Sequence, residues 1–340
     1  MSTRPLSRDR GFTIVELLVV IGIIAILLAL LAPALGGAIR RSHKFEETNG
    51  LREVAKAWNL YANAFSGAAL PGYLEHDPSM QGPRPGWNVE YEYHTPPPGT
   101  TSIVIPQDIA APWTWRLLPY LSYNHDVIHG HLDEPNVDQS NMTTDAEVQE
   151  IAYEPGFGYN GYYVGGYWEM VDLGGDDIPR YRFFDARADL NGDDSIDPNE
   201  FARVVVRSIS QIRRSTELVV FCSSSEVEPG VYKKWKSNRP GSHIVIPPWL
   251  AGVEQWGFPK PSGPGGPGSP GGGDMQAAAG LGDMWTIEAF IETSVPIARY
   301  TKSTAVVHAD GHTANQSARD LMDMRQWIDT ADKKDYQHLP

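Results

Sequence analysis

The chain has 340 residues, a formal net charge of −14 and a sequence pI near 5.1. This acidic balance argues against nucleic acid or an anionic membrane surface as the partner of a soluble part. The single cysteine, Cys222, excludes a disulfide within the chain. An exported domain of this composition must therefore rely on its core, on bound ions or on assembly for stability.

A nearly unbroken apolar segment runs from Phe12 to Leu35, after a short basic N-terminus. A helix needs about 20 apolar residues to cross the hydrocarbon core of a bilayer, so this segment predicts a membrane-spanning helix. Its one acidic residue is Glu16. A carboxylate inside a membrane helix costs about 2.5–3.5 kcal/mol, which indicates a functional role and a cationic partner for Glu16.

Two other interpretations of the apolar segment compete. One is a secretory signal, because Ala32-Pro33-Ala34 imitates a cleavage site with small residues, although signal cores span about 7–15 apolar residues and lack a buried acid. The other is a plain single-span anchor, which leaves Glu16 unexplained. Basic residues flank the segment on both sides and do not fix its orientation. The size of the following domain favours a cytoplasmic N-terminus.

Helical spacing continues beyond the apolar segment. Apolar and aromatic residues recur on one side of a helix at Phe45, Leu51, Val54, Trp58, Tyr61 and Phe65. The pattern predicts an amphipathic helix over residues 36–66 that extends the membrane helix and buries its aromatic side against a sheet. Pro33, Gly36-Gly37 and Gly50 are expected weak points or kinks along it.

Short β-type runs dominate after residue 66. Strands are predicted over residues 101–105, 159–164, 219–222, 243–246 and 303–308, and helical pieces over 113–121, 144–151, 200–209 and 319–330. This order predicts an α+β fold in which the long N-terminal helix packs on an antiparallel β-sheet that carries large loop insertions. The Gly- and Pro-rich segment 261–273 is expected to be a flexible loop.

The N-terminus resembles a known processing signal. Gly11-Phe12 followed by Glu16 is similar to the cleavage site of type IV prepilins. In that family a peptidase cuts after the glycine, and the new terminal phenylalanine is N-methylated. The resemblance implies that Phe12 becomes the mature N-terminus and that its ammonium group pairs with Glu16 of a neighbouring subunit. It also implies a leader over residues 1–11, a membrane half of the helix over 12–35, an amphipathic half over 36–66 and a pilin-like globular domain over 67–340.

Further segments resemble the large pilin-like proteins of planctomycete-type bacteria, at residues 113–121, 159–162 and 210–214. That family carries a C-terminal signature of His, nine residues and Asp-Gly. Here Asp310-Gly311 is present, but Tyr300 stands at the histidine position. The prediction of a strand and turn over residues 306–313 does not depend on that histidine.

The ligand positions of a twelve-residue EF-hand or dockerin-type calcium loop are matched by the side chains of Asp189, Asn191, Asp193, Asp197 and Glu200 and by the main-chain carbonyl of Ser195. Asp194 departs from the pattern, because the turn usually requires glycine there. The alternative is a solvated acidic turn that caps a helix beginning near Glu200. The density of carboxylates favours the cation, and the sequence predicts a structural Ca²⁺ with the modest affinity of extracellular modules.

Enzymatic patterns are weak. His125, His129 and His131 have a spacing that could bind a transition metal, but no His-Glu-x-x-His occurs and the flanking residues predict a polar loop. His308 and His312 flank Asp310-Gly311, which is first a hairpin turn, and one of the two histidines is expected to face solvent. Ser223-Ser224-Ser225 lacks a nucleophile elbow. The chain is not expected to be an enzyme.

Together these features predict a pilin or pseudopilin that prepilin peptidase processes and that assembles into a type II secretion or type IV pilus-like filament. The expected partners are other filament subunits, the peptidase, an inner-membrane assembly platform and the membrane itself. The precursor would lie in the bacterial cytoplasmic membrane, with its globular domain in the periplasm or at the cell surface. The alternative is a membrane-anchored extracellular module that binds glycan or a secreted protein and forms no filament.

Overall fold

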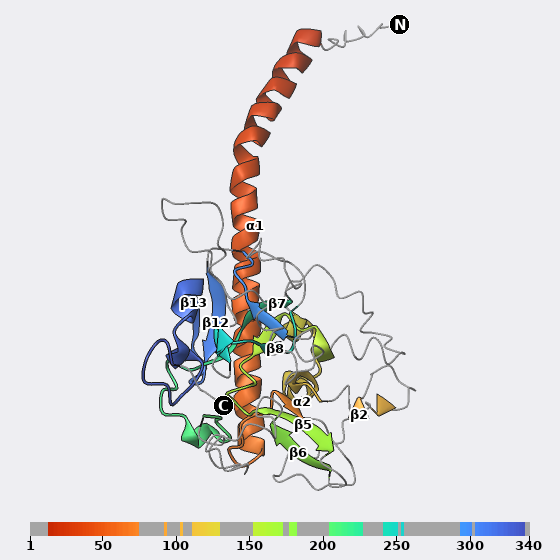
Figure 1. The fold of residues 1–340 in the computed structure, drawn as a ribbon. Coiled ribbons are helices and arrows are strands. Elements are labelled where there is room, and N and C mark those ends of the chain that lie inside the picture. The colour runs from red at the N-terminus through yellow and green to blue at the C-terminus, as the bar shows by residue number, and fades with distance from the viewer. Residues whose placement is uncertain are drawn as a thin grey trace, which may run out of the picture. The chain divides into compact units, whose positions relative to one another are not determined.

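The computed structural model describes residues 13–74, 92–93, 103–104, 111–129, 152–172, 177–181, 204–226, 241–250, 253–254, 293–300 and 303–336. The chain divides into two compact units, Met1–Lys44 and Phe45–Pro340. One helix, α1, runs from Ile14 to Ala64 and contributes to both units (Figure 1). The long N-terminal helix is thus confirmed, and it continues through the expected weak points.

Gly50 has a packing role inside α1. A Cβ atom added at this position would lie 3.0 Å from Cζ of Phe157 and 3.1 Å from the carbonyl oxygen of Val127. Such distances are shorter than ordinary van der Waals contacts. The missing side chain therefore allows the Phe157 ring to lie against the helix backbone.

The second part of α1 buries one face in the globular unit. Leu51, Val54, Trp58 and Tyr61 are at most 2% exposed, at steps of three and four residues. Phe45 was predicted on the same face, but its side chain is exposed. Each residue turns a helix by about 100°, so Phe45 lies about 120° around the axis from Leu51.

The largest sheet among the described residues has six strands in the order β11-β8-β4-β7-β12-β13. Their bounds are β4 Phe157–Tyr159, β7 Val219–Glu226, β8 Ile244–Val245, β11 Thr293–Pro296, β12 Thr304–His308 and β13 Thr313–Gln316. Strand β7 pairs antiparallel with β4, β11 and β12, whereas β8 runs parallel to β4 and β11. The α+β class is confirmed, with a sheet that is mixed where β8 enters it.

Aromatic side chains join α1 to this sheet. The Nε1–H of Trp58 donates to the hydroxyl of Tyr159 at 3.2 Å, and that hydroxyl donates to the carbonyl oxygen of Leu70 at 2.7 Å. The Phe221 ring of β7 lies 4.6 Å from the ring of Tyr159 and 5.0 Å from that of Trp113. All these polar atoms are paired, so the large rings are buried without unsatisfied donors. In Figure 1, β12 and β13 lie beside α1, and the side chain of Arg52 donates to Thr313 at 3.2 Å.

Smaller elements surround this core. The helices are α2 Trp113–Leu117, η1 Leu118–Leu121, α3 Asp126–His129, η2 Ile209–Gln211, α8 Ala318–Leu321 and η4 Met324–Gln326. The strands are β1 Tyr73–Leu74, β2 Glu92–Tyr93, β3 Ile103–Val104, β5 Tyr167–Asp172, β6 Asp177–Tyr181, β9 Trp249–Leu250 and β10 Val253–Glu254. The helical prediction over 113–121 is confirmed by α2 and η1.

Three predicted elements are wrong in part. The helix over 200–209 is absent from the described residues 204–208, where Val206 bridges to Val164 and Ser208 to Ala68, and only Ile209 is helical, as the first residue of η2. Three consecutive valines disfavour a helix because β-branched side chains lose rotamer freedom there. The strand over 159–164 ends at Tyr159, before a turn that begins at Gly161. The helix over 319–330 is divided into α8 and η4, because Asp323 caps the second piece by accepting from the Arg325 N–H at 3.1 Å.

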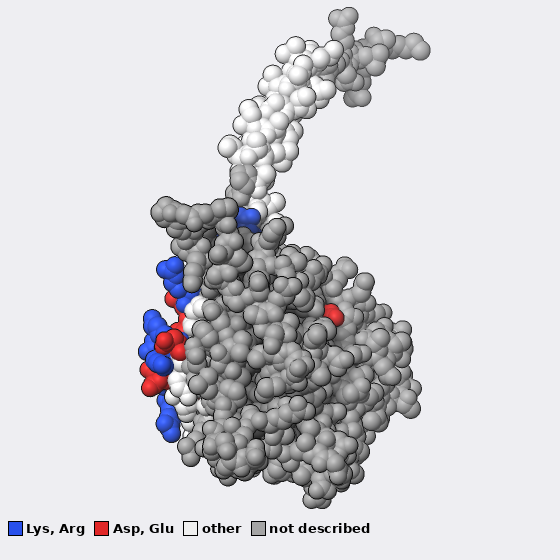
Figure 2. Space-filling view, viewed as in Figure 1, with Lys and Arg blue, Asp and Glu red and all other residues white. Residues whose placement is uncertain are grey.

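Charged side chains of both signs gather along one edge of the globular unit in Figure 2. Ion pairs of the described surface include Arg325 with Asp323 and Lys56 with Glu53, each at 2.6 Å. Exposed pairs of this kind contribute little to stability. The mixture of signs on this edge does not form a basic patch, in agreement with the net charge.

Candidate functional site

The N-terminal end of α1 holds Glu16 in a defined position. Its Oε2 accepts the backbone N–H of Thr13 at 2.9 Å and the Thr13 hydroxyl at 2.8 Å. In return, the Thr13 hydroxyl oxygen accepts the N–H of Glu16 at 3.2 Å. This reciprocal arrangement is a capping box, which explains why the helix begins at Ile14. The carboxylate also lies at the helix end that favours negative charge.

One oxygen of this carboxylate has no such bond. Within residues 13–74, Oε1 of Glu16 accepts no hydrogen bond. Gly11 and Phe12, where processing is predicted, lie outside the described residues. Chemically, Glu16 can hold its own helix end through Oε2 and receive an ammonium group through Oε1.

The helix around Glu16 presents hydrocarbon to its surroundings. Large apolar side chains from Ile14 to Leu35 are 44% to 80% exposed. By length and composition α1 is able to cross a membrane, a property that a signal sequence near the N-terminus would share. A continuous apolar surface of this extent is unfavourable in water, so lipid or other apolar helices must cover it.

The prediction of a polar loop around the histidine cluster is wrong, because two of its histidines are buried. His125, directly before α3, and His129, its last residue, are 2% and 3% exposed, and burial lowers the pKa of each to about 4. Both are therefore neutral at pH 7. His131 lies outside the described residues. In the part of the chain that is described, no group of three or more His, Cys, Asp or Glu side chains could hold a metal ion.

The Asp-Gly signature forms the predicted hairpin turn between β12 and β13. Gly311 has φ +88°, a conformation that glycine adopts without cost. Asp310 Oδ1 accepts the backbone N–H of His312 at 3.0 Å, and the rings of His308 and His312 stack 4.2 Å apart. His308 is buried and His312 is exposed, as expected. The turn geometry accounts for Asp310-Gly311.

A buried ion pair that the sequence analysis missed joins α1 to the sheet. Glu47 Oε1 accepts the hydroxyl of Ser223 at 2.6 Å and lies 3.9 Å from Nε of Arg299. The side chains of Glu47 and Arg299 are 4% and 3% exposed. Burial lowers the pKa of Arg299 to about 10, although the Glu47 charge works against this shift. Glu47 lies four residues before Leu51, on the apolar face, and this position could have identified it as buried.

The predicted calcium ligands, from Asp189 to Glu200, all lie outside the described residues. The calcium site therefore stays a prediction. The same holds for the Gly- and Pro-rich loop over 261–273.

A family model for the prokaryotic N-terminal methylation motif matches residues 6–32. The chain carries a prepilin-type N-terminal signal. The matched range includes Gly11, Phe12 and Glu16, and it overlaps the exposed apolar part of α1. No curated protein and no solved structure matches the chain.

The prepilin-type signal supports processing by prepilin peptidase, as in pilins and pseudopilins. Together with the apolar helix it is consistent with membrane anchoring. The match ends at residue 32, so it does not extend into the globular unit that begins at Phe45. The resemblance to the planctomycete-type family rests on the sequence segments alone.

Proposed function

We propose that the chain is a structural subunit of the pilin or pseudopilin class. It is inserted into the bacterial cytoplasmic membrane as a single-span precursor and cleaved between Gly11 and Phe12 by prepilin peptidase. The mature helix then assembles with other subunits, through an inner-membrane platform, into a filament of a type II secretion or type IV pilus-like system. The globular unit is carried in the periplasm or at the cell surface, and the role involves no catalytic step.

One observation carries this proposal: Glu16 sits in an exposed, otherwise apolar segment of α1, and one of its carboxylate oxygens accepts no hydrogen bond from the described residues. A lone charge in a hydrocarbon environment is unfavourable unless a counter-charge meets it. Cleavage after Gly11 would create an ammonium group on Phe12. Supplied by a neighbouring copy, that group would neutralise Glu16 and set the register between subunits.

N-terminal mass spectrometry of the membrane-associated protein tests the processing step. The expected result is a mature chain that begins with methylated Phe12. A chain that begins at Met1 or at Leu35 would contradict it, the second because it would indicate removal of the whole apolar segment as a secretory signal.

Substitution at Glu16 tests assembly. We expect Glu16→Gln, which keeps the shape and removes the charge, to be cleaved and displayed but to lose filament formation at least tenfold. The matched control is Thr13→Ala, which weakens the local cap and keeps the carboxylate, and which should still assemble. Filaments that form equally well with Glu16→Gln would favour the alternative, a membrane-anchored binding module for glycan or a secreted protein.

We also propose a structural Ca²⁺ for the loop from Asp189 to Glu200. Support comes from the ligand pattern at loop positions 1, 3, 5, 9 and 12 and from the chain's single cysteine, which leaves an exported domain without disulfides. An ion that binds only the folded loop stabilises the fold by mass action.

A further inference from the structure

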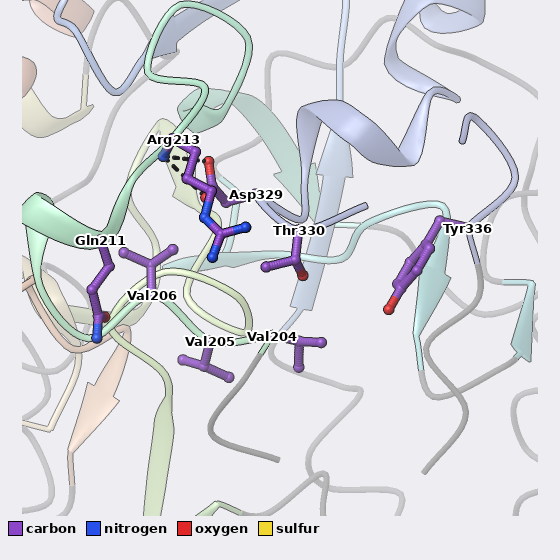
Figure 3. Close-up of a pocket in the computed structure, with 8 residues that line it drawn as sticks. All are labelled: Val204, Val205, Val206, Gln211, Arg213, Asp329, Thr330 and Tyr336. Carbon is purple, nitrogen blue, oxygen red and sulfur yellow. Dashed lines mark hydrogen bonds between the residues drawn. The ribbon is translucent and has the colours of Figure 1, made fainter. Parts of the chain in front are cut away.

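A cavity lies at the junction of the segment 204–213 with the C-terminal segment 329–336. Its volume is about 490 Å³, within the range of small-molecule sites, and Figure 3 shows the side chains around it. It is lined by Val204, Val205, Val206, Gln211, Arg213, Asp329, Thr330 and Tyr336. Three adjacent valines thus provide an apolar wall, and the other side chains are polar.

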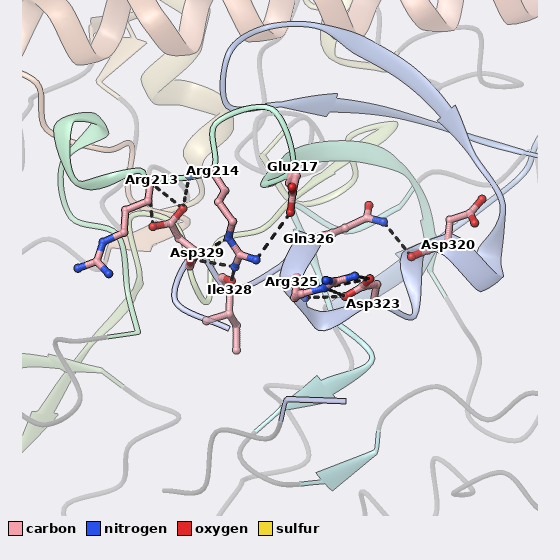
Figure 4. A network of polar contacts seen from close by, with 9 residues as sticks. All are labelled: Arg213, Arg214, Glu217, Asp320, Asp323, Arg325, Gln326, Ile328 and Asp329. Carbon is pink, nitrogen blue, oxygen red and sulfur yellow. Dashed lines mark hydrogen bonds and ion pairs between the residues drawn. The ribbon is translucent and has the colours of Figure 1, made fainter. Parts of the chain in front are cut away.

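Hydrogen bonds of Asp329 join the two segments that enclose the cavity. Its Oδ1 and Oδ2 accept the backbone N–H of Arg213, each at 3.0 Å, and Oδ1 also accepts that of Arg214 at 2.9 Å. The Arg214 guanidinium donates to the carbonyl oxygens of Ile328 and Asp329, both at 2.8 Å. Figure 4 shows this network across the two segments.

Arg213 takes part in that network through its backbone alone. Its guanidinium group extends into the cavity in Figure 3. It forms no ion pair or hydrogen bond with any residue that the structure describes, and the side chain is exposed. None of the described residues therefore neutralises this cation, which lies beside the valine wall.

Besides Arg213, three polar lining residues can donate a hydrogen bond to a ligand: Gln211 through its amide and Thr330 and Tyr336 through their hydroxyls. Gln211 Oε1 already accepts the backbone N–H groups of Arg207 at 2.9 Å and of Ser208 at 3.1 Å, so the side chain of Gln211 offers only its N–H groups. Both oxygens of Asp329 are likewise occupied. A ligand that offers acceptor atoms and a negative charge would pair with these donors and with Arg213.

A carboxylate meets these requirements better than a phosphate. One guanidinium group offers a planar pair of N–H donors that matches a single carboxylate. Asp329 brings a negative charge to the same cavity, and the whole chain is at −14, which disfavours a dianion. The valine wall suits a short apolar body attached to the carboxylate.

We propose that this cavity binds the carboxylate of a ligand with a short branched apolar body, with Arg213 as the anion-binding residue. Such a group occurs at the C-terminus of a peptide that ends in an aliphatic residue and in free branched carboxylic acids. The site is independent of the N-terminal helix and of filament assembly, so it can fail while the proposed function holds.

Isothermal titration calorimetry on the full-length chain in a non-ionic detergent tests the site with two acids, N-acetyl-leucine and 4-methylpentanoate. We expect both to bind at one site, and Arg213→Gln to weaken binding at least tenfold without lowering the melting temperature. The matched control, Lys333→Gln, removes the same charge from an exposed residue outside the cavity and should change affinity less than twofold. Tighter binding of N-acetyl-leucine would indicate that the natural ligand is the C-terminus of a peptide. Tighter binding of 4-methylpentanoate would indicate that it is a free carboxylic acid.

Three comparisons sharpen the test. N-acetyl-leucinamide, which lacks the charge, should bind at least tenfold more weakly than N-acetyl-leucine. Arg213→Lys should give an intermediate affinity, because the charge stays and the paired donors are lost. The proposal is overturned if neither acid binds or if inorganic phosphate binds more tightly than both acids. It is also overturned if N-acetyl-leucinamide binds as tightly as N-acetyl-leucine, or if Arg213→Gln binds the acids as tightly as the unsubstituted chain.

Discussion

At the scale of single residues, the contact between Glu47 and Arg299 decides how α1 is held on the sheet. Both side chains are almost wholly buried, and Ser223 on β7 donates to the same carboxylate. Arg299 also donates to the carbonyl oxygens of Ser224 and, at 3.4 Å, of Gly156. Desolvation offsets most of the attraction in such a pair, so its presence contributes less than its loss would cost.

We predict that Arg299→Met lowers the free energy of unfolding by about 3–5 kcal/mol, because it leaves the Glu47 carboxylate buried without its counter-charge. The double substitution Glu47→Gln with Arg299→Met should recover part of this loss. Lys56→Met, which breaks an exposed pair, should stay within about 0.5 kcal/mol of the parent. Denaturant unfolding followed by tryptophan fluorescence provides the measurement. Equal losses for Arg299→Met and Lys56→Met would contradict a buried pair.

At the scale of elements, the sequence pattern predicted the helices and strands that depend on the spacing of apolar residues along the chain. The buried face of α1 follows from the spacing of Leu51, Val54, Trp58 and Tyr61, and β7 and β12 follow from their apolar runs. The partner of Glu47 could not be predicted, because Arg299 reaches it only through the folding of the whole sheet. Burial of His125 and His129 was missed for the same reason, since the polar residues beside them do not reveal contacts with distant residues such as Trp115, whose ring packs on His125.

The buried histidines His125 and His129 predict a pH dependence of stability. The pKa of His125 and of His129 is lowered to about 4 in the folded chain, whereas the ordinary value is about 6.5. Between these values the unfolded chain binds more protons, so the free energy of unfolding should fall as pH drops from about 6.5 to about 4. Each histidine contributes at most about 1.4 kcal/mol per pH unit to this slope.

Melting curves at a series of pH values measure the slope. His125→Gln should reduce it by about one histidine's share, whatever its effect on stability at pH 7. Trp115→Phe alters a buried neighbour of His125 that does not titrate, and should lower stability with the slope kept. An unchanged slope with His125→Gln would mean that this ring is already protonated in the folded chain or does not titrate differently on unfolding.

At the scale of the whole molecule, the two units of the chain are stabilised in different ways. The first unit exposes its apolar residues and depends on lipid or neighbouring helices, whereas the second unit encloses a core of tryptophan, tyrosine and valine side chains. The chain has one cysteine, and it is buried. Burial raises the pKa of the Cys222 thiol, which therefore stays protonated and adds no covalent link to the core. A bound ion would add stability to a unit that has no disulfide.

Calcium should therefore raise the melting temperature of the globular unit. With a dissociation constant of about 10⁻⁴ to 10⁻³ M, 10 mM free Ca²⁺ stabilises the folded state by about 1–3 kcal/mol, which corresponds to several degrees. Glu200→Gln removes the bidentate ligand and should abolish the shift, whereas Glu53→Gln, an exposed acid on α1, should keep it. Calorimetry of the full-length chain with calcium or with EGTA measures both. A shift that Glu200→Gln retains would mean that the ion binds elsewhere. No shift at 10 mM would favour the alternative, a solvated acidic turn over residues 189–200, because water would then already screen the repulsion between the carboxylates.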